Sequence, residues 1–398
     1  MLLNKTKNLI KALFCRLHIL EDNGPKDYYI SKVSRKAPWV YIAYISDIFY
    51  HKDNKSVRNS HQNRREALAQ VEVFNELGYN VYVQQYLSKR EIPKLKFDII
   101  FGHEPNFVRA VEKNPDAFKV HYVPGAYIDH RNSQIIRMTD YVNKTYNSSI
   151  PYRRLLEYDN PNHSSKIAYE VSDKILMIGS KFTVDTFPVH LHSKIVTIHQ
   201  STQLTHTIKN IQYAPANEFF FMGSGGNILK GISLLVEYFS KHPEYVINIV
   251  GPIEDDVKEA LHTRLTDNII FHGYVDVNSD TMIDIMKRCN FIIYPSGSEG
   301  MPGAVLNSMK NGLIPIVTKW AAFDEIEEYG YILEDWSVNA IGKGINWTHS
   351  LSQDNILRLK RNCSVYIENT YNIDRYKKEF KDFFVQSIKT IKNAAYEK

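Results

Sequence analysis

The sequence predicts an α/β fold of two domains, each built on a parallel sheet with helices on both faces. Apolar strand-like runs alternate with helical segments through both halves of the chain, which is the pattern of such sheets. A polar, weakly patterned stretch at 201–217 separates the two series and is the best candidate for a linker. With 398 residues, 43% of them hydrophobic, the chain is long enough for two domains.

The first series of elements begins with a strong strand and continues as strand–helix pairs. Strands are expected at 39–46, 81–86, 97–101, 119–123, 174–179 and 194–199. A helix at about 64–77 ends at Gly78, and a long helical region rich in Tyr and Arg follows Gly125. This half reads as a Rossmann-like domain.

The second series repeats the alternation after the linker. Strands are expected at 219–222, 246–250, 269–271, 291–294 and 313–318, with helices at 232–240, 281–289 and 303–310. An amphipathic helix at 371–392 closes the chain. Two such halves predict a deep cleft between domains, where ligands usually bind.

The most informative stretch is 291–318, a strand–loop–helix–strand unit with one acid, Glu299, in its Gly/Pro/Ser loop. In open α/β sheets ligands bind at the carboxyl ends of the strands. The helix that follows offers unpaired N–H groups and a partial positive charge, which suit a phosphate. This unit therefore predicts a binding site for a phosphorylated ligand.

A glycine-bearing turn at 223–231 is the second candidate for phosphate binding. Its glycines let the backbone approach a diphosphate closely, and Lys230 adds a point charge. A Gly-x-Gly run is a weak signal by itself, because a loop with a solvated lysine explains it equally well. The run is also not the dinucleotide fingerprint, since Ile228 stands where the third glycine would be.

These two segments and the run 271–275 resemble the group 1 glycosyltransferases, a retaining family of GT-B fold. The matching segments are Glu299-Gly300-Met301-Pro302-Gly303, Asn311 to Val317, Lys230-Gly231, and Phe271-His272-Gly273-Tyr274-Val275. They occur in the family's order and cover roughly 219–335. The chain departs from the family at Asn307, where a second Glu is usual, and at Ser224, where an Arg is usual. The run Gly-Ser-Gly-Gly is similar to a bacterial subgroup that lacks this Arg.

The resemblance implies a role for each matching residue. Glu299 would face the donor sugar, Lys230 would neutralise the diphosphate, and Asn307 would hold ribose hydroxyls with a weaker, uncharged hydrogen bond. The amides of 223–226 and of the helix that begins at Gly303 would add donors. The implied donor-binding residues are Gly223, Ser224, Gly225, Gly226, Lys230, Gly273, Tyr274, Glu299, Gly300, Met301, Pro302, Gly303 and Asn307.

The first domain should bind the acceptor. The family often places a histidine of this domain near the reacting carbon, and here His103 ranks first and His130 second. Arg64 and Arg65 are candidates for an anionic acceptor, although Asn63 with Glu66 also reads as a capping box that begins a helix. The catalytic candidates are therefore Glu299, Lys230, His103 and His130.

Composition restricts the other classes of function. The net charge of +5 fits a polyanionic substrate, an anionic membrane surface or solubility alone. The three cysteines are odd in number and lack metal-ligand spacing, which favours a reducing cytosol and no disulfide or zinc site. The chain has no basic stripe interleaved with aromatic residues, so nucleic-acid binding is not predicted. It also has no Asp-x-Asp motif after an apolar strand, so no metal site is predicted. No metal or cofactor is expected beyond the nucleotide sugar as co-substrate.

The first 20 residues are basic and amphipathic, and two interpretations stay open. They lie on an anionic membrane surface, or they dock their Leu face on the protein, which is favoured slightly. No apolar run reaches the ~20 residues that span a bilayer. We expect a cytoplasmic protein, with peripheral attachment to the inner face of the plasma membrane as the alternative.

The predicted organisation and function combine these observations. The acceptor-binding domain is expected at 1–204, the linker at 205–217, the nucleotide-sugar-binding domain at 218–370, and a helix that packs back on the first domain at 371–398. The predicted reaction is metal-independent, retaining transfer of a sugar from a nucleotide-diphosphate donor to a sugar or lipid-linked oligosaccharide, in building a bacterial-type surface polysaccharide. The alternatives are a non-catalytic binding protein of the same fold and a GT-B-type nucleotide-sugar epimerase.

Overall fold

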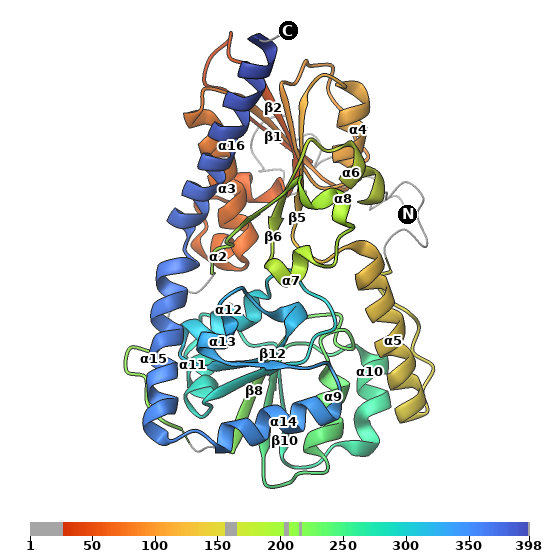
Figure 1. The fold of residues 1–398 in the computed structure, drawn as a ribbon, viewed down its shortest axis with the longest axis vertical. Coiled ribbons are helices and arrows are strands. Elements are labelled where there is room, and N and C mark those ends of the chain that lie inside the picture. The colour runs from red at the N-terminus through yellow and green to blue at the C-terminus, as the bar shows by residue number, and fades with distance from the viewer. Residues whose placement is uncertain (1–26, 156–164, 203–206, 215–216, 397–398) are drawn as a thin grey trace, which may run out of the picture.

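The computed structural model describes residues 27–155, 165–202, 207–214 and 217–396. Two separate sheets lie one above the other along the long axis of the molecule, each flanked by helices (Figure 1). The basic segment at 1–20 lies outside the described residues, as do parts of the expected linker.

The first sheet has seven strands in the order β1-β3-β2-β4-β5-β6-β7. The strands are β1 Tyr28–Ser31, β2 Trp39–Tyr44, β3 Asn80–Gln85, β4 Ile99–Gly102, β5 Phe118–Val123, β6 Lys174–Ile178 and β7 Ile195–Ile198. All neighbours are parallel except β1, which pairs antiparallel with β3 at the edge. The sequence analysis missed β1, whose four residues are partly exposed and carry no period-2 pattern.

Helices cover both faces of the first sheet, as Figure 1 shows. They are η1 Asp47–Tyr50, α2 Lys55–Asn59, α3 Gln62–Glu76, α4 Asn106–Lys113, α5 Ile128–Tyr146, α6 Ser165–Val171, α7 Lys181–Val184 and α8 Val189–His192. The helix α3 ends at Leu77, and Gly78 continues in the left-handed region with φ of +87°. The expected helix at 64–77 is thereby confirmed.

The second sheet has six strands, all parallel, in the order β10-β9-β8-β11-β12-β13. The strands are β8 Glu218–Met222, β9 Val246–Val250, β10 Ile269–Gly273, β11 Phe291–Tyr294, β12 Ile314–Thr318 and β13 Tyr331–Leu333. Its flanking helices are α9 Ile232–Phe239, α10 Asp255–Leu261, η2 His262–Arg264, α11 Asp280–Lys287, α12 Gly303–Lys310, η3 Lys319–Ala321, α13 Ile326–Tyr329 and α14 Val338–His349. The strands β8 and β11 are buried throughout apart from Glu218, as parallel strands covered on both faces should be.

Two long helices complete the chain, α15 Gln353–Thr370 and α16 Ile373–Tyr396. They run end to end along one side of both domains (Figure 1). The helix α16 packs on α3 of the first domain, where the rings of Phe380 and Phe384 lie edge-on to Phe74. Lys377 adds ion pairs of 2.8 Å to both Glu72 and Glu76 of α3.

The helix α5 departs from the first domain and lies against the second (Figure 1). The Tyr141 hydroxyl donates to Glu237 of α9 over 2.7 Å, and the Trp336 indole N–H donates to Gln134 over 2.9 Å. The segment 128–155, which we call the α5 excursion, therefore reaches the second domain although it belongs to the first series. No helix within the described ranges is long and apolar enough to cross a membrane.

Candidate active site

A cavity of about 620 Å³ lies between the two sheets. The first domain lines it with residues that follow β2, β4 and β5 and with the last residue of β6, and the second domain lines it with residues that follow β8, β9 and β11. The carboxyl ends of the strands in two parallel sheets thus face one another across it, which is the edge where ligands of such sheets bind.

Gly300 lies in close contact with the backbone of the first domain at this cavity. A Cβ atom on Gly300 would lie 2.3 Å from the carbonyl oxygen of Pro124 and 2.6 Å from that of Ile178. These carbonyls follow β5 and end β6 of the first domain. The Thr183 hydroxyl donates a 3.2 Å hydrogen bond to the Gly300 carbonyl. Only glycine fits here, and this contact fixes the position of the neighbouring Glu299.

Glu299 lines the cavity as predicted and is held from behind by β11. The hydroxyl of Tyr294 donates to Glu299 Oε1 over 2.9 Å, and the Glu299 N–H donates to the Trp320 carbonyl over 3.1 Å. Burial, with the charge of Glu299 next, raises the pKa of Tyr294 well above its usual value, so the hydroxyl stays a donor. The second oxygen of Glu299 has no hydrogen bond with any residue that the structure describes, so it can accept one from a ligand hydroxyl.

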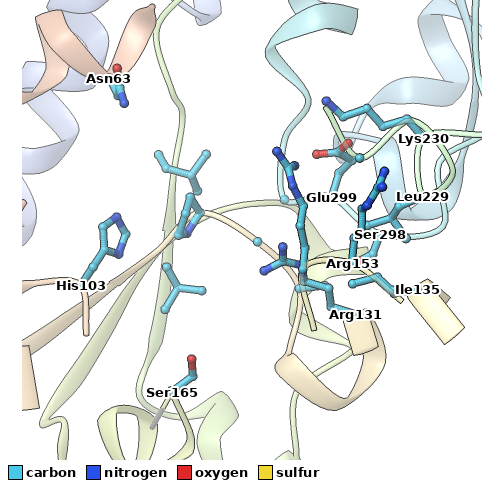
Figure 2. A pocket seen from close by; sticks show the side chains of 18 of the residues that line it. Asn63, His103, Arg131, Ile135, Arg153, Ser165, Leu229, Lys230, Ser298 and Glu299 are labelled. Atoms are coloured by element: carbon cyan, nitrogen blue, oxygen red, sulfur yellow. The ribbon is translucent and has the colours of Figure 1, made fainter. Parts of the chain in front are cut away.

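Lys230 lines the same cavity, next to Glu299 (Figure 2). Its ammonium donates to the carbonyl of Ser224 over 2.9 Å, across the turn that follows β8. Of the predicted donor-binding residues 223–226 in this turn, Gly226 lines the cavity, whereas Gly223, Ser224 and Gly225 do not.

Two of the backbone amides expected to hold phosphate already have acceptors. The Gly223 N–H donates to the Val250 carbonyl over 3.0 Å, within the continuation of the sheet. The Gly226 N–H donates to Glu254 Oε1 over 2.6 Å, and the Asn227 N–H donates to Glu254 Oε2 over 3.3 Å. The turn is therefore an anion-binding loop whose inner amides hold a carboxylate of the protein itself.

His103, the preferred histidine, follows β4 and lines the cavity on the side opposite Lys230 (Figure 2). Its ring packs on Tyr122 and Tyr44, with ring centroids 5.3 Å and 5.1 Å away. Burial lowers the pKa of His103 to about 4, so the imidazole is neutral at physiological pH. A neutral imidazole can donate or accept one hydrogen bond with a sugar hydroxyl.

A buried polar cluster stands behind His103. His121 Nε2 lies 2.7 Å from Glu104 Oε2, and the Ser165 hydroxyl donates to the other oxygen of Glu104. Although burial raises the pKa of Glu104, the charge and hydrogen bond of His121 lower it well below the usual range. The donor atoms of His103, Glu104 and His121 lie within 4.8 Å of one another, a spacing that could hold a metal ion. The Glu104 carboxylate is already engaged on both oxygens.

His130, the second histidine, does not line the cavity. Its Nε2 lies 3.2 Å from the Gly297 carbonyl, and its ring packs beside Trp320. It therefore joins α5 to the loop after β11 and supports that loop from outside.

The two arginines proposed for the acceptor also lie outside the cavity lining. Arg64 forms an ion pair of 2.9 Å with Asp47, and buried nitrogen atoms of Arg65 have no partner among the described residues. The capping box predicted for Asn63 and Glu66 is wrong. His61 caps α3 instead, and the Glu66 carboxylate accepts from the N–H of Ser201 over 2.6 Å. Tertiary burial of Glu66 has overridden the local pattern.

The remaining donor-binding candidates lie at or beyond the rim of the cavity. Gly300 lines it, whereas Met301, Pro302, Gly303, Asn307, Gly273 and Tyr274 do not. Asn307 is 4% exposed, with its Oδ1 atom unpartnered among the described residues, and Tyr274 is 81% exposed.

Sequence reasoning missed three arginines that line the cavity, Arg131, Arg153 and Arg154. Arg131 stands in the first turn of α5, and Arg153 and Arg154 lie near the end of the α5 excursion. A polar run around Arg131 was the only signal, and it is equally typical of a solvated loop.

Comparison with known proteins agrees with this geometry. Residues 208–355 match the profile of the family described as glycosyl transferases group 1. The second domain is a group 1 glycosyltransferase domain. The predicted resemblance is thereby confirmed for the segment of the chain that carries Lys230 and Glu299. No curated protein matches the sequence.

Solved structures extend the likeness of this glycosyltransferase domain to the whole fold. A sucrose-phosphate synthase from Thermosynechococcus elongatus is 12% identical with a TM-score of 0.58, over 89% of this chain and 100% of that chain. The Anabaena protein HepE, in complex with UDP and glucose, is 11% identical with a TM-score of 0.53, over 88% of this chain and 100% of that chain. A TarM variant from S. aureus is 13% identical with a TM-score of 0.50, over 72% of this chain and 55% of that chain. The predicted GT-B fold, two Rossmann-like domains facing each other across a cleft, is confirmed.

Proposed function

We propose that this chain transfers a sugar from a nucleotide-diphosphate donor to a hydroxyl group of a sugar or lipid-linked oligosaccharide. The observation that carries the proposal is that Lys230 and Glu299 line one cavity of about 620 Å³, between the carboxyl ends of two parallel sheets. That volume lies in the range of pockets that hold nucleotide-sized ligands. The group 1 family of the second domain and the UDP in the HepE complex support a nucleotide sugar as donor.

The chemistry assigns one task to each of the two side chains. As the bond from the anomeric carbon to the diphosphate breaks, its electron pair leaves on the phosphate oxygen, and Lys230 stabilises that charge. The acceptor oxygen forms the new bond to the anomeric carbon, and its proton passes to the departing phosphate oxygen. Glu299, oriented by Tyr294, accepts hydrogen bonds from the donor sugar and holds its anomeric carbon towards the first domain.

Three further properties belong to the proposal. Transfer retains the anomeric configuration and needs no metal, as the resemblance to the family implies. The product is a surface polysaccharide. The chain works in the cytoplasm or on the inner face of the plasma membrane, where the basic residues within 1–20 would meet anionic lipid. Sedimentation with anionic liposomes, with and without residues 1–20, tests the last property, and equal binding by both forms would contradict it.

Donor turnover tests the central proposal. Nucleotide sugars with different bases and sugars are incubated with the enzyme and scored for released nucleoside diphosphate. We expect Lys230→Ala to lower turnover by about 30-fold or more, equivalent to ~2 kcal/mol, the scale of losing one oxyanion donor. Glu299→Ala should have an effect of the same order. Lys343→Ala is the matched control, because Lys343 lies on α14 outside the cavity and pairs with Glu334.

The same assay separates the alternatives. Nucleotide binding without turnover of any donor or acceptor would identify a binding protein of the same fold. A changed sugar that is still attached to its nucleotide would identify an epimerase. Normal turnover in Lys230→Ala would remove the phosphate role of that lysine.

A further inference from the structure

The cavity is lined by four carboxylates and by four basic side chains, of which Lys230 and Arg153 have hydrogen-bond partners. Four carboxylates line it, and each is engaged elsewhere: Glu66 with Ser201, Glu104 with His121 and Ser165, Glu254 with Gly226 and Asn227, and Glu299 with Tyr294. The guanidinium groups of Arg131 and Arg154 line it too, and neither group has an ion pair or hydrogen bond with any residue that the structure describes. Two guanidinium groups that share a cavity and form no direct ion pair with its carboxylates form a site for an anion.

Arg154 lies directly on the glycine turn of the second domain. A Cβ atom on Gly225 would lie 2.7 Å from Arg154 Nη2, and one on Gly226 would lie 3.1 Å from Arg154 Nη1. Both glycines also have positive φ, +55° and +68°. The absence of side chains on this turn therefore makes room for the guanidinium group as well as permitting the backbone conformation.

The α5 excursion brings both arginines to this place and holds them there. Arg153, next to Arg154, forms two hydrogen bonds with Asp256 of α10, of 2.8 Å and 2.5 Å. The Tyr146 hydroxyl donates to the Ser233 carbonyl of α9 over 2.6 Å. Arg131 starts the excursion, and Figure 2 shows it below Glu299 and Lys230. The pKa of Arg131 is lowered, first by burial and then by the charge of Arg154. Both effects disfavour the charged guanidinium group, and a bound anion would stabilise it.

We infer that Arg154, with Arg131, holds the diphosphate of the nucleotide-sugar donor. The pair supplies, from the α5 excursion of the first domain, the fixed cation that group 1 glycosyltransferases carry at the position of Ser224. This inference rests on the proposed function and adds residues to it. A guanidinium group binds two phosphate oxygens at once, so it both neutralises and orients the leaving diphosphate. Donor binding would then tie the α5 excursion to the glycine turn of the second domain.

Binding of nucleoside diphosphates and of the matching nucleosides tests the inference. Titration calorimetry is run with UDP, GDP, ADP and CDP, each beside uridine, guanosine, adenosine or cytidine. With the diphosphate that binds tightest, we expect Arg154→Gln and Arg131→Gln each to weaken binding by about 10-fold or more, while the nucleoside changes less than about twofold. The loss should shrink as salt rises. Arg137→Gln is the matched control, because that arginine is exposed on the same helix, over the Trp336 ring and outside the cavity.

A rescue experiment separates charge from structure. Ser224 is exposed, so Ser224→Arg can be introduced into the Arg154→Gln protein without disturbing the core. We expect this double variant to regain most of the lost diphosphate affinity, which a purely structural role of Arg154 would not allow.

Several results would overturn the inference. One is unchanged diphosphate affinity in Arg154→Gln, including the case in which only the Michaelis constant for the acceptor rises. Another is an equal loss of nucleoside affinity, which would mean a damaged fold. If the wild-type protein is folded but binds none of the four diphosphates, the proposed function fails along with the inference. If diphosphate binding and turnover survive in Arg154→Gln, only the inference fails.

Discussion

The hydroxyl of Tyr294 donates a 2.9 Å hydrogen bond to the carboxylate of Glu299, and this pair links the core of the second sheet to the cavity. Tyr294 ends β11 and is 1% exposed, so its ring is fixed by packing. Glu299 stands five residues later, where the loop meets the first domain. The hydrogen bond from the sheet therefore sets the orientation of the Glu299 carboxylate, which the flexible side chain alone would not fix.

Removing this hydroxyl should lower turnover and leave the fold intact. Tyr294→Phe keeps the buried ring but leaves Glu299 without its donor, and a hydrogen bond to a charged group contributes ~1.5–3 kcal/mol. We expect the turnover number to fall by about 10-fold or more, with diphosphate affinity unchanged. Steady-state kinetics with the preferred nucleotide sugar measures it. A turnover number equal to that of the wild type would mean that Glu299 needs no such support.

The close contact at Gly300 predicts that a methyl group added to this residue would push the two domains apart. In Gly300→Ala the new Cβ would lie 2.3 Å and 2.6 Å from two backbone oxygens, which cannot move aside as a flexible side chain can. We expect a stability loss of ~1–3 kcal/mol from overpacking and a larger loss of turnover, because Glu299 is adjacent. Gly125→Ala is the control for stability, since a Cβ there has nothing within 4 Å. Equal melting temperatures for both variants would contradict the contact.

His103 should titrate far below the usual histidine range. Burial lowers its pKa to about 4, so it stays neutral wherever the enzyme works, and folding loses stability as pH falls below the unfolded value of 6.5. Histidine-labelled NMR spectra, assigned by comparison with His103→Asn, follow the titration. A midpoint near 4 is expected. A midpoint near 6.5 would show an exposed imidazole, and the pH dependence of activity would then include it.

Glu66 should make the protein less stable as pH rises from about 4.5 towards neutrality. Burial raises its pKa to about 7 against the opposing hydrogen bonds from Ser201. The unfolded chain releases this proton near 4.5, so the folded state loses stability between pH 4.5 and 7, by roughly 3 kcal/mol. Glu66→Gln removes the charge and keeps the acceptor for the Ser201 N–H. Urea unfolding of both proteins at several pH values should show that the free energy of unfolding of the variant rises relative to that of the wild type over that range. The same pH dependence of the unfolding free energy in both proteins would refute the assignment.

The C-terminal helix should contribute strongly to the stability of the first domain. Phe384 of α16 is fully buried, with its ring centroid 4.6 Å from that of Phe74. Phe384→Ala should cost ~3–5 kcal/mol of unfolding free energy, the range for deleting a buried aromatic ring. Lys378→Ala on the same helix, whose side chain is 76% exposed, should cost less than ~1 kcal/mol. Chemical unfolding compares them, and similar losses would mean that α16 does not pack as described.

The sequence predicted most strands and the two central cavity residues because both depend on local signals. The strand at 291–294 and the loop that carries Glu299 are one contiguous pattern, and hydrophobic runs marked every parallel strand expected. The helix α15 was missed although its sequence is amphipathic. Its Lys360 is buried, with the ammonium donating to the Cys289 carbonyl and to Asn290, whereas a lysine in a sequence suggests solvent.

The rest of the site depends on tertiary contacts that no local pattern reveals. Arg154 reaches the glycine turn only because the α5 excursion packs on the second domain, so its position follows from contacts about a hundred residues away, such as that between Arg153 and Asp256. Glu66 fits a capping box by spacing, yet it points to Ser201. Asn307 has the right place in the motif, but the helix α12 buries it away from the cavity lining.

An experimental structure of the complex with a nucleoside diphosphate tests the central claim most directly. The phosphates should lie in the cavity between the sheets, within hydrogen-bond distance of the Lys230 ammonium and on the same side as Glu299. Phosphates bound on another surface, or in the cavity but out of reach of Lys230, would contradict the assignment.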